Sequence, residues 1–188
     1  MSLVCKQHRF THIQIPKTGT SSVKRYFDEL NITTHEKKHK LPIWSHLDWK
    51  QHFTFAFVRH PEDWLYSWYN YRRNSPKNVV CKRLTFTQWV IHININREHS
   101  SDWECRHQHE WLLGEDGKIL VDYVTKYENL KQGLKYVCNK LNLPQHELSH
   151  TNVGTYDNKK KQLEVSSSRD IIKEYYAIDY DIYNSINN

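Results

Sequence analysis

Cysteine, glycine and proline are scarce in this chain of 188 residues, which has four Cys, five Gly and five Pro. The cysteines are far apart and form no C-x-x-C pair, so a disulfide-built scaffold is excluded. No apolar run is long enough for a signal peptide or a membrane span, which predicts a soluble, cytoplasmic protein. Because Gly and Pro are so few, those that fall within motifs are informative.

Aromatic residues are plentiful at 13%, and the formal net charge is +6. A chain of this length and composition predicts one folded domain, residues 1–188, with a substantial core. The positive charge favours an anionic partner, but charge alone does not choose among nucleic acid, a polyanionic glycan and a phosphate-bearing cofactor.

Residues 10–30 have the pattern of a strand, a tight turn and a helix. Pro16 ends the strand, and Gly19 permits a ligand to approach the backbone closely. A helix start offers unpaired N–H groups and partial positive charge, so a phosphate can bind there with Lys17 closing over it. The residues suited to cap this helix are Thr20, Ser21 and Ser22.

Residues 52–59 form a second, nearly continuous apolar run, which is typical of a strand buried on both faces of a parallel sheet. Pro61 and the acidic residues after it mark the start of a helix. Arg59 lies at this junction, where open α/β sheets bind ligands and where a guanidinium can hold a phosphate bidentately. Ser67, about two helical turns further on, is placed to offer a hydroxyl to the same group.

Further elements follow the same alternation of strands and helices, which predicts an α/β fold. A short helix is predicted around residues 43–49 and a longer one over 84–95. A turn is predicted over 114–117, a strand over 118–127 and an amphipathic helix over 129–141. Residues 149–168 are predicted to form a polar loop, and 169–186 a closing helix.

The two phosphate-binding elements together resemble those of sulfotransferases. Pro16-Lys-Thr-Gly-Thr-Ser21 resembles the loop that binds the 5′-phosphosulfate, and Val58-Arg59-x-Pro61-x5-Ser67-x-Tyr69 resembles the motif that binds the 3′-phosphate. The segments Gln108-x-x-Trp111-Leu112 and Tyr127-Glu128-Asn-Leu130 are similar to the middle of the carbohydrate and type 2 branch. Two departures stand out: Trp64 replaces a common Arg, and His60 replaces a common Asn.

The resemblance implies a three-layer α/β sandwich with a central, mainly parallel sheet, related to the P-loop nucleotide hydrolases. It also implies transfer of a sulfuryl group from 3′-phosphoadenosine 5′-phosphosulfate (PAPS), without a metal, to a hydroxyl or amine of an acceptor, which we expect to be a carbohydrate. Neither a nucleic-acid partner nor a membrane span is expected. The residues implied for the donor site are Lys17, Thr18, Gly19, Thr20, Ser21, Ser22, Arg59 and Ser67.

The resemblance also implies a general base, which in that family is a His or Glu between the two phosphate motifs. Five candidates lie in that interval of this chain. His39 is favoured because a Lys-His pair there is the family's usual arrangement, and His46 is the second choice. An imidazole suits the role because its unperturbed pKa is near 6.5.

Three other functions stay open at the level of sequence. A magnesium-dependent kinase would use Lys17 and Thr18 with Asp122, although the Gly-Lys-Ser/Thr order of a P-loop is missing. A non-catalytic domain that binds nucleic acid or another polyanion would account for the charge and the aromatic residues. An inactive sulfotransferase is the third.

Two histidine patterns raise the question of a metal. His35-Glu-Lys-Lys-His39 matches the H-E-x-x-H zinc motif, but it lacks the apolar helix face that the motif needs. Cys105-x-His107-x-His109 is a second pattern, whose alternating spacing equally suits a loop or an edge strand. No metal site is therefore predicted.

Overall fold

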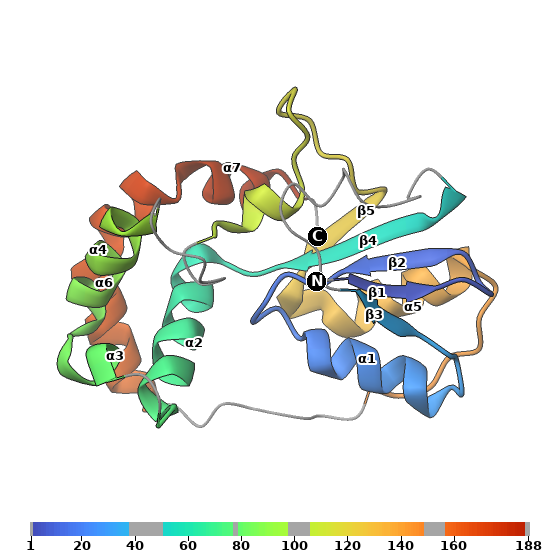
Figure 1. Ribbon diagram of the computed structural model, residues 1–188, viewed down its shortest axis with the longest axis horizontal. Coiled ribbons are helices and arrows are strands. Elements are labelled where there is room, and N and C mark those ends of the chain that lie inside the picture. Colours follow the sequence, from blue (N-terminus) through green and yellow to red (C-terminus); the bar gives the residue numbers. More distant parts are fainter. Residues whose placement is uncertain (1, 38–50, 77–78, 98–105, 149–156, 187–188) are drawn as a thin grey trace. The chain divides into compact units, whose positions relative to one another are not determined.

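The computed structural model describes residues 2–37, 51–76, 79–97, 106–148 and 157–186 (Figure 1). They form two compact units: residues 1–59 with 108–152 and 185–188, and residues 60–107 with 153–184. Among the helices of the described ranges, none combines the length and apolarity needed to cross a membrane.

The first unit is built on a five-stranded sheet in the order β3-β1-β2-β4-β5. Strand β2 pairs in parallel with β4, and β4 with β5, whereas β1 is antiparallel to both β2 and β3. Four of the five strands therefore share one direction, and the predicted α/β class is confirmed. The elements of this unit are β1 (Ser2–Cys5), β2 (Phe10–Ile13), α1 (Thr20–Glu29), β3 (His35–Lys37), β4 (Phe53–Val58), η5 (Gln108–Trp111), β5 (Tyr123–Lys126), η6 (Tyr127–Asn129) and α5 (Leu130–Lys140).

The core of this unit lies between one face of the sheet and the helices α1 and α5. Phe10, at the start of β2, packs with its ring centre 4.7 Å from that of Phe27 in α1. Phe55 of β4 and Val137 of α5 are completely buried in the same cluster. Apolar residues of α1 and α5 fall on one side of each helix, so both helices bury that side against the sheet.

The second unit is helical: α2 (Pro61–Asn74), α3 (Val79–Arg83), α4 (Phe86–Ile95), α6 (Asn158–Tyr175) and α7 (Ala177–Ser185). Helix α2 starts at Pro61, as predicted, and ends at Asn74. The core of this helical unit is aromatic, with Trp64 and Trp89 almost completely buried. Aromatic side chains bury large apolar areas, so a few of them suffice to hold a small helical unit together.

Three predicted boundaries are wrong. The polar loop predicted over 149–168 is helical from Asn158 onward, because the Asp157 carboxylate accepts hydrogen bonds from the N–H groups of Lys159 and Lys160 and caps α6. The closing helix is interrupted at Tyr176, between α6 and α7. The strand predicted over 118–127 is paired with β4 only over Tyr123–Lys126. The helix predicted around residues 43–49 lies outside the described residues.

Candidate active site

The site lies where the parallel strands end. Strands β2, β4 and β5 point the same way, so their carboxyl ends meet at one edge of the sheet. Lys17 lies in the turn after β2, Arg59 directly follows β4, and Tyr127 directly follows β5. This edge is where open α/β sheets bind ligands, and the sequence prediction for Lys17 and Arg59 places both there.

The turn after β2 has an unusual backbone. Lys17 and Gly19 both lie in the left-handed region, with φ of +67° and +81°. Gly19 is the N-cap of α1, and no side chain caps the helix, so the prediction that a Thr or Ser caps it is wrong. The Thr18 hydroxyl is buried and donates to the Ile15 carbonyl at 2.8 Å, which closes the turn. The residues predicted as caps, Thr20, Ser21 and Ser22, form the first turn of α1 instead.

Arg59 is held at both ends. Its backbone N–H donates to Gln108 Oε1 at 2.9 Å, and its carbonyl accepts from Gln108 Nε2 at 2.8 Å. Its guanidinium carbon lies 4.9 Å from the centre of the Tyr127 ring, and one terminal nitrogen is 3.5 Å from the Lys17 carbonyl. Its Nε is buried and has no hydrogen-bond partner among the described residues. The guanidinium therefore keeps donor capacity for an anion.

Electrostatics at this edge also favour an anion. The pKa of the Lys17 ammonium is lowered, first by burial and second by the positive charge of Arg59. Both effects penalise the charged form of the lysine. A phosphate or phosphosulfate between the two cations would remove the second effect and oppose the first, so binding such a group stabilises the charged site.

Ser67, the other residue predicted for the 3′-phosphate, lies in α2 of the second unit and is only 4% exposed. The start of α2 is fixed by Glu62, whose Oε1 accepts from Arg169 Nε at 2.9 Å and from the Tyr180 hydroxyl at 3.0 Å. Burial raises the pKa of the Tyr180 hydroxyl, and its bond to Glu62 raises it further. Joint binding of one phosphate by Arg59 and Ser67 stays a prediction.

The predicted general bases, His39 and His46, lie outside the described residues. The H-E-x-x-H pattern can still be judged from its first half, because His35 and Glu36 lie in strand β3 and pair with β1. A strand places successive side chains on opposite faces, whereas the zinc motif needs a helix with both histidines on one face. The described half of the pattern therefore does not lie on the helix that the zinc motif requires. Of the second pattern, Cys105 also lies outside the described residues.

Asp122 does not occupy the position that the kinase alternative requires. It precedes β5, and its Oδ2 accepts from the backbone N–H and the hydroxyl of Thr54 at 2.7 Å each. Thr54 is the second residue of β4, so this link lies at the amino ends of the parallel strands, opposite the Lys17 turn. The hypothesis that Asp122 holds magnesium next to Lys17 is therefore wrong.

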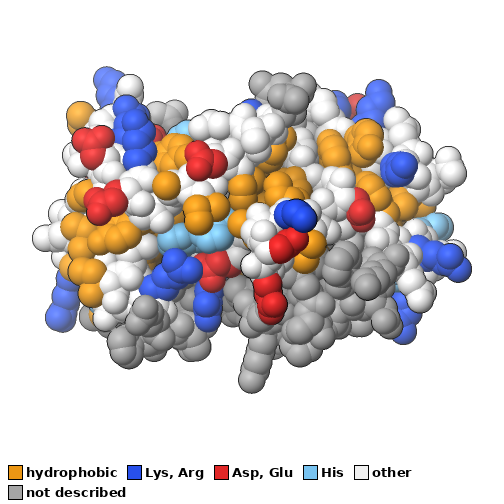
Figure 2. All heavy atoms as spheres, turned by 90° about the horizontal axis from the view of Figure 1, so that it is seen from above, with side chains coloured by type: hydrophobic (Ala, Val, Ile, Leu, Met, Phe, Trp, Pro, Cys, Tyr) orange, Lys and Arg blue, Asp and Glu red, His pale blue; other side chains and the backbone are white. Residues whose placement is uncertain are grey.

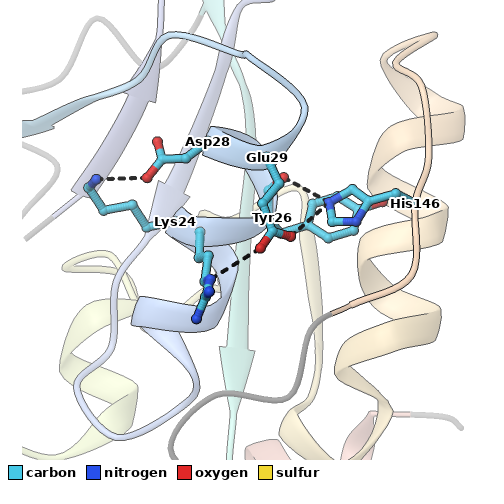
Figure 3. Close-up of polar contacts among 6 residues, drawn as sticks. Lys24, Tyr26, Asp28, Glu29 and His146 are labelled. Atoms are coloured by element: carbon cyan, nitrogen blue, oxygen red, sulfur yellow. Dashed lines mark hydrogen bonds and ion pairs between the residues drawn. The ribbon is translucent and has the colours of Figure 1, made fainter.

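On the face that Figure 2 shows, Lys and Arg side chains of each unit are scattered among acidic and apolar ones. A hollow of about 270 Å³ in the first unit is lined by residues of α1, α5 and the segment 145–148, and none of the predicted site residues line it. His146 stacks there on Tyr26 with ring centres 4.3 Å apart, and its Nε2 lies 3.1 Å from the Tyr26 carbonyl and 3.5 Å from Glu29 (Figure 3).

Gln108 and Tyr127 are the residues of this site whose roles sequence reasoning missed. Both fall in segments that resemble the family, yet nothing in their spacing shows that one binds the backbone of Arg59 and the other its guanidinium. Gln108 is 49 positions and Tyr127 is 68 positions away from Arg59 in the sequence. Only the folded structure shows that they are in contact.

A comparison with protein families agrees with this geometry. The model of the sulfotransferase family matches residues 1–184. No curated protein and no solved structure matches the chain significantly. With a match over nearly the whole chain, and with a lysine turn and an arginine at the ligand-binding edge of an α/β sheet, the chain belongs to the sulfotransferase family, whose members are PAPS-dependent transferases.

Proposed function

We propose that this chain transfers the sulfuryl group of PAPS to a hydroxyl of a carbohydrate. The observation that carries the proposal is the pair of cations, Lys17 and Arg59, at the carboxyl edge of the sheet, with a buried donor atom on Arg59 that has no partner among the described residues. The residues fit the donor: Gly19 is the N-cap of α1 and makes no side-chain cap, so a phosphate can bind the N–H groups of the helix start without displacing one. The family match spans both units, which supports a single functional domain of residues 1–188.

Each residue has a role in this proposal. Lys17 and the N–H groups of residues 18–22 bind the 5′-phosphosulfate and neutralise the charge that develops on the leaving phosphate. Arg59 and Ser67 bind the 3′-phosphate. When bound, PAPS supplies the sulfuryl group, and adenosine 3′,5′-bisphosphate is the product that remains.

The acceptor side of the reaction needs a base. We assign this role to His39, with His46 as the second candidate, so that the imidazole takes the proton of the acceptor hydroxyl while the new S–O bond forms. Carbohydrate is the proposed acceptor because aromatic side chains can stack on sugar rings and the excess of Lys and Arg suits acidic sugars.

The first experiment is titration calorimetry of the purified chain with adenosine 3′,5′-bisphosphate and with ADP, each with and without Mg²⁺. Tight binding of the bisphosphate that does not depend on Mg²⁺ supports the proposal. A preference for ADP with Mg²⁺ would favour a kinase, and binding of neither would overturn the donor site.

Two variants then assign the roles. Lys17→Ala and Arg59→Ala are both expected to abolish sulfuryl transfer, while only Arg59→Ala removes the preference for the 3′-phosphate. Lys24→Ala is the control, because Lys24 is an exposed lysine of α1 that pairs with Asp28. An Arg59→Ala protein that still prefers the bisphosphate would remove Arg59 from its assigned role.

A further inference from the structure

Gln108 makes an unusual pair of contacts with Arg59. Its carboxamide accepts from the Arg59 N–H at 2.9 Å and donates to the Arg59 carbonyl at 2.8 Å. Strand pairing between β4 and β5 stops one residue earlier, where Val58 pairs with Lys126. The side chain of Gln108 thus takes the place that a neighbouring strand would have and extends the ordered backbone by one residue.

Few side chains can make this pair of bonds. A carboxamide carries one acceptor and one donor on the same planar group, whereas an ionised carboxylate only accepts. Gln108 is 2% exposed, so water has little access to replace it. Backbone groups that lose their hydrogen-bond partners away from water are costly, so Gln108 stabilises the backbone conformation of Arg59.

The far end of Arg59 is fixed separately, by the Tyr127 ring and the Lys17 carbonyl. An arginine side chain has many rotamers, and ordering it on ligand binding costs affinity. An arginine whose backbone and guanidinium are both held before the ligand arrives avoids much of that cost.

We propose that Gln108 is a positioning residue for Arg59 and, through it, sets the selectivity for the 3′-phosphate of the donor. The proposal rests on the function proposed above, because it takes Arg59 as the 3′-phosphate ligand. Both ends of the Gln108 carboxamide hold the backbone of Arg59, so in this proposal Gln108 acts on the donor through Arg59. Its loss therefore weakens the distinction between donors with and without a 3′-phosphate.

The test is a double-mutant cycle read by calorimetry. Dissociation constants for adenosine 3′,5′-bisphosphate and adenosine 5′-phosphate are measured for the wild type, Gln108→Met, Arg59→Ala and the double variant. Gln108→Met keeps a side chain of similar length but loses both hydrogen bonds. We expect it to weaken bisphosphate binding about tenfold and adenosine 5′-phosphate binding less than twofold. In the Arg59→Ala background the same change should leave the ratio of the two constants unaltered.

A control separates selectivity from loss of stability. Ser168→Ala removes a completely buried hydroxyl that bonds the Glu164 carbonyl and Thr87, in the helical unit. Ser168→Ala should lower the melting temperature without changing the ratio of the two dissociation constants. If Gln108→Met does not fold, Gln108→Glu is measured instead, since it keeps the bond from the Arg59 N–H and loses the donor to the carbonyl. Gln108→Glu is expected to reduce the preference for the bisphosphate over adenosine 5′-phosphate less than Gln108→Met does.

The two proposals fail in different ways. If the wild type prefers the bisphosphate and Arg59→Ala removes that preference, but Gln108→Met and Gln108→Glu keep it, the role of Gln108 is overturned and the proposed function stands. A wild type with no preference for the bisphosphate overturns both. A further change of the ratio in the double variant would show that Gln108 acts independently of Arg59, which also overturns the proposal.

Discussion

The guanidinium carbon of Arg59 lies 4.9 Å from the centre of the Tyr127 ring. The same ring also lies next to Gly19 in the turn after β2, because a Cβ added to Gly19 would lie 3.0 Å from Tyr127 Cε2. One aromatic side chain therefore touches the arginine assigned to the 3′-phosphate and the glycine of the loop assigned to the 5′-phosphosulfate. Tyr127 therefore packs against both Arg59 and the turn that contains Gly19.

Replacing Tyr127 tests this link. Tyr127→Ala removes a cation–π contact, which is worth roughly 0.5–2 kcal/mol, so affinity for adenosine 3′,5′-bisphosphate should fall about 2- to 30-fold. Tyr127→Phe keeps the ring face and should retain most of the contact with Arg59. Calorimetry on both variants makes the measurement. Equal losses in Tyr127→Phe and Tyr127→Ala would assign the effect to the hydroxyl instead of the ring.

Gly19 and Gly117 offer a matched comparison of glycines with positive φ. Both lie in the left-handed region, but a Cβ on Gly117 would meet nothing within 4 Å, whereas one on Gly19 would press on Tyr127 and Leu130. Gly117→Ala should cost about 1 kcal/mol of unfolding free energy from backbone strain alone. Gly19→Ala should cost more and also weaken bisphosphate binding, as measured by urea unfolding and calorimetry. Equal costs in the two variants would mean that the Tyr127 contact contributes nothing.

The parts of the fold that sequence predicted are those with strong local signals. Pro61, followed by acidic residues, fixed the start of α2, and the apolar spacing of residues 130–141 predicted α5. Strand β3, His35–Lys37, was missed because its three residues are all polar, and β1, Ser2–Cys5, because only a short apolar stretch marks it. The first half of α6 was missed because it begins with a run of lysines and because few of the helix's residues are buried. The buried residues of α6 are Val165, Ser168 and Ile172.

For the site, the sequence indicated the charged residues that would bind the donor, but not the residue that holds Arg59 in place. Lys17 and Arg59 belong to motifs of fixed spacing, and both lie at the predicted edge of the sheet. Gln108 binds the backbone of Arg59 across 49 positions of sequence, a contact that only the folded chain reveals. Asp122 was assigned to the wrong end of the sheet, because sequence shows only that a carboxylate adjoins an apolar run. The direction and bounds of the strand decide which edge it occupies.

Asp122 has a structural role that can be measured. Asp122→Ala leaves the N–H and hydroxyl of Thr54, a completely buried residue, without their acceptor. The free energy of unfolding should fall by roughly 1–3 kcal/mol, while the KM for PAPS stays unchanged. The control is Asp116→Ala, because Asp116 accepts from Lys118 in an exposed turn and should matter less. Loss of transfer in Asp122→Ala at unchanged stability would restore a catalytic role.

His12 introduces a pH dependence into the stability of the sheet. It lies in β2, completely buried, with its ring stacked on Phe55 at 4.9 Å, and neither ring nitrogen has a hydrogen-bond partner among the described residues. Burial lowers the pKa of His12 from 6.5 to about 3. In the folded chain this imidazole therefore stays neutral at any pH above about 3.

Between pH 6.5 and about 3, His12 binds a proton in the unfolded chain but not in the folded one. The free energy of unfolding therefore falls as pH is lowered through this window, by up to about 1.4 kcal/mol per pH unit from this residue. His12→Leu removes that contribution, so the difference in unfolding free energy between variant and wild type should grow in favour of the variant as pH falls from 7 to 4. Urea unfolding at several pH values measures this difference, with His8→Leu as a control at a partly exposed histidine of the same unit. Parallel stability curves for His12→Leu and wild type would show that His12 is protonated equally in both states, and its burial in β2 would then no longer explain acid lability.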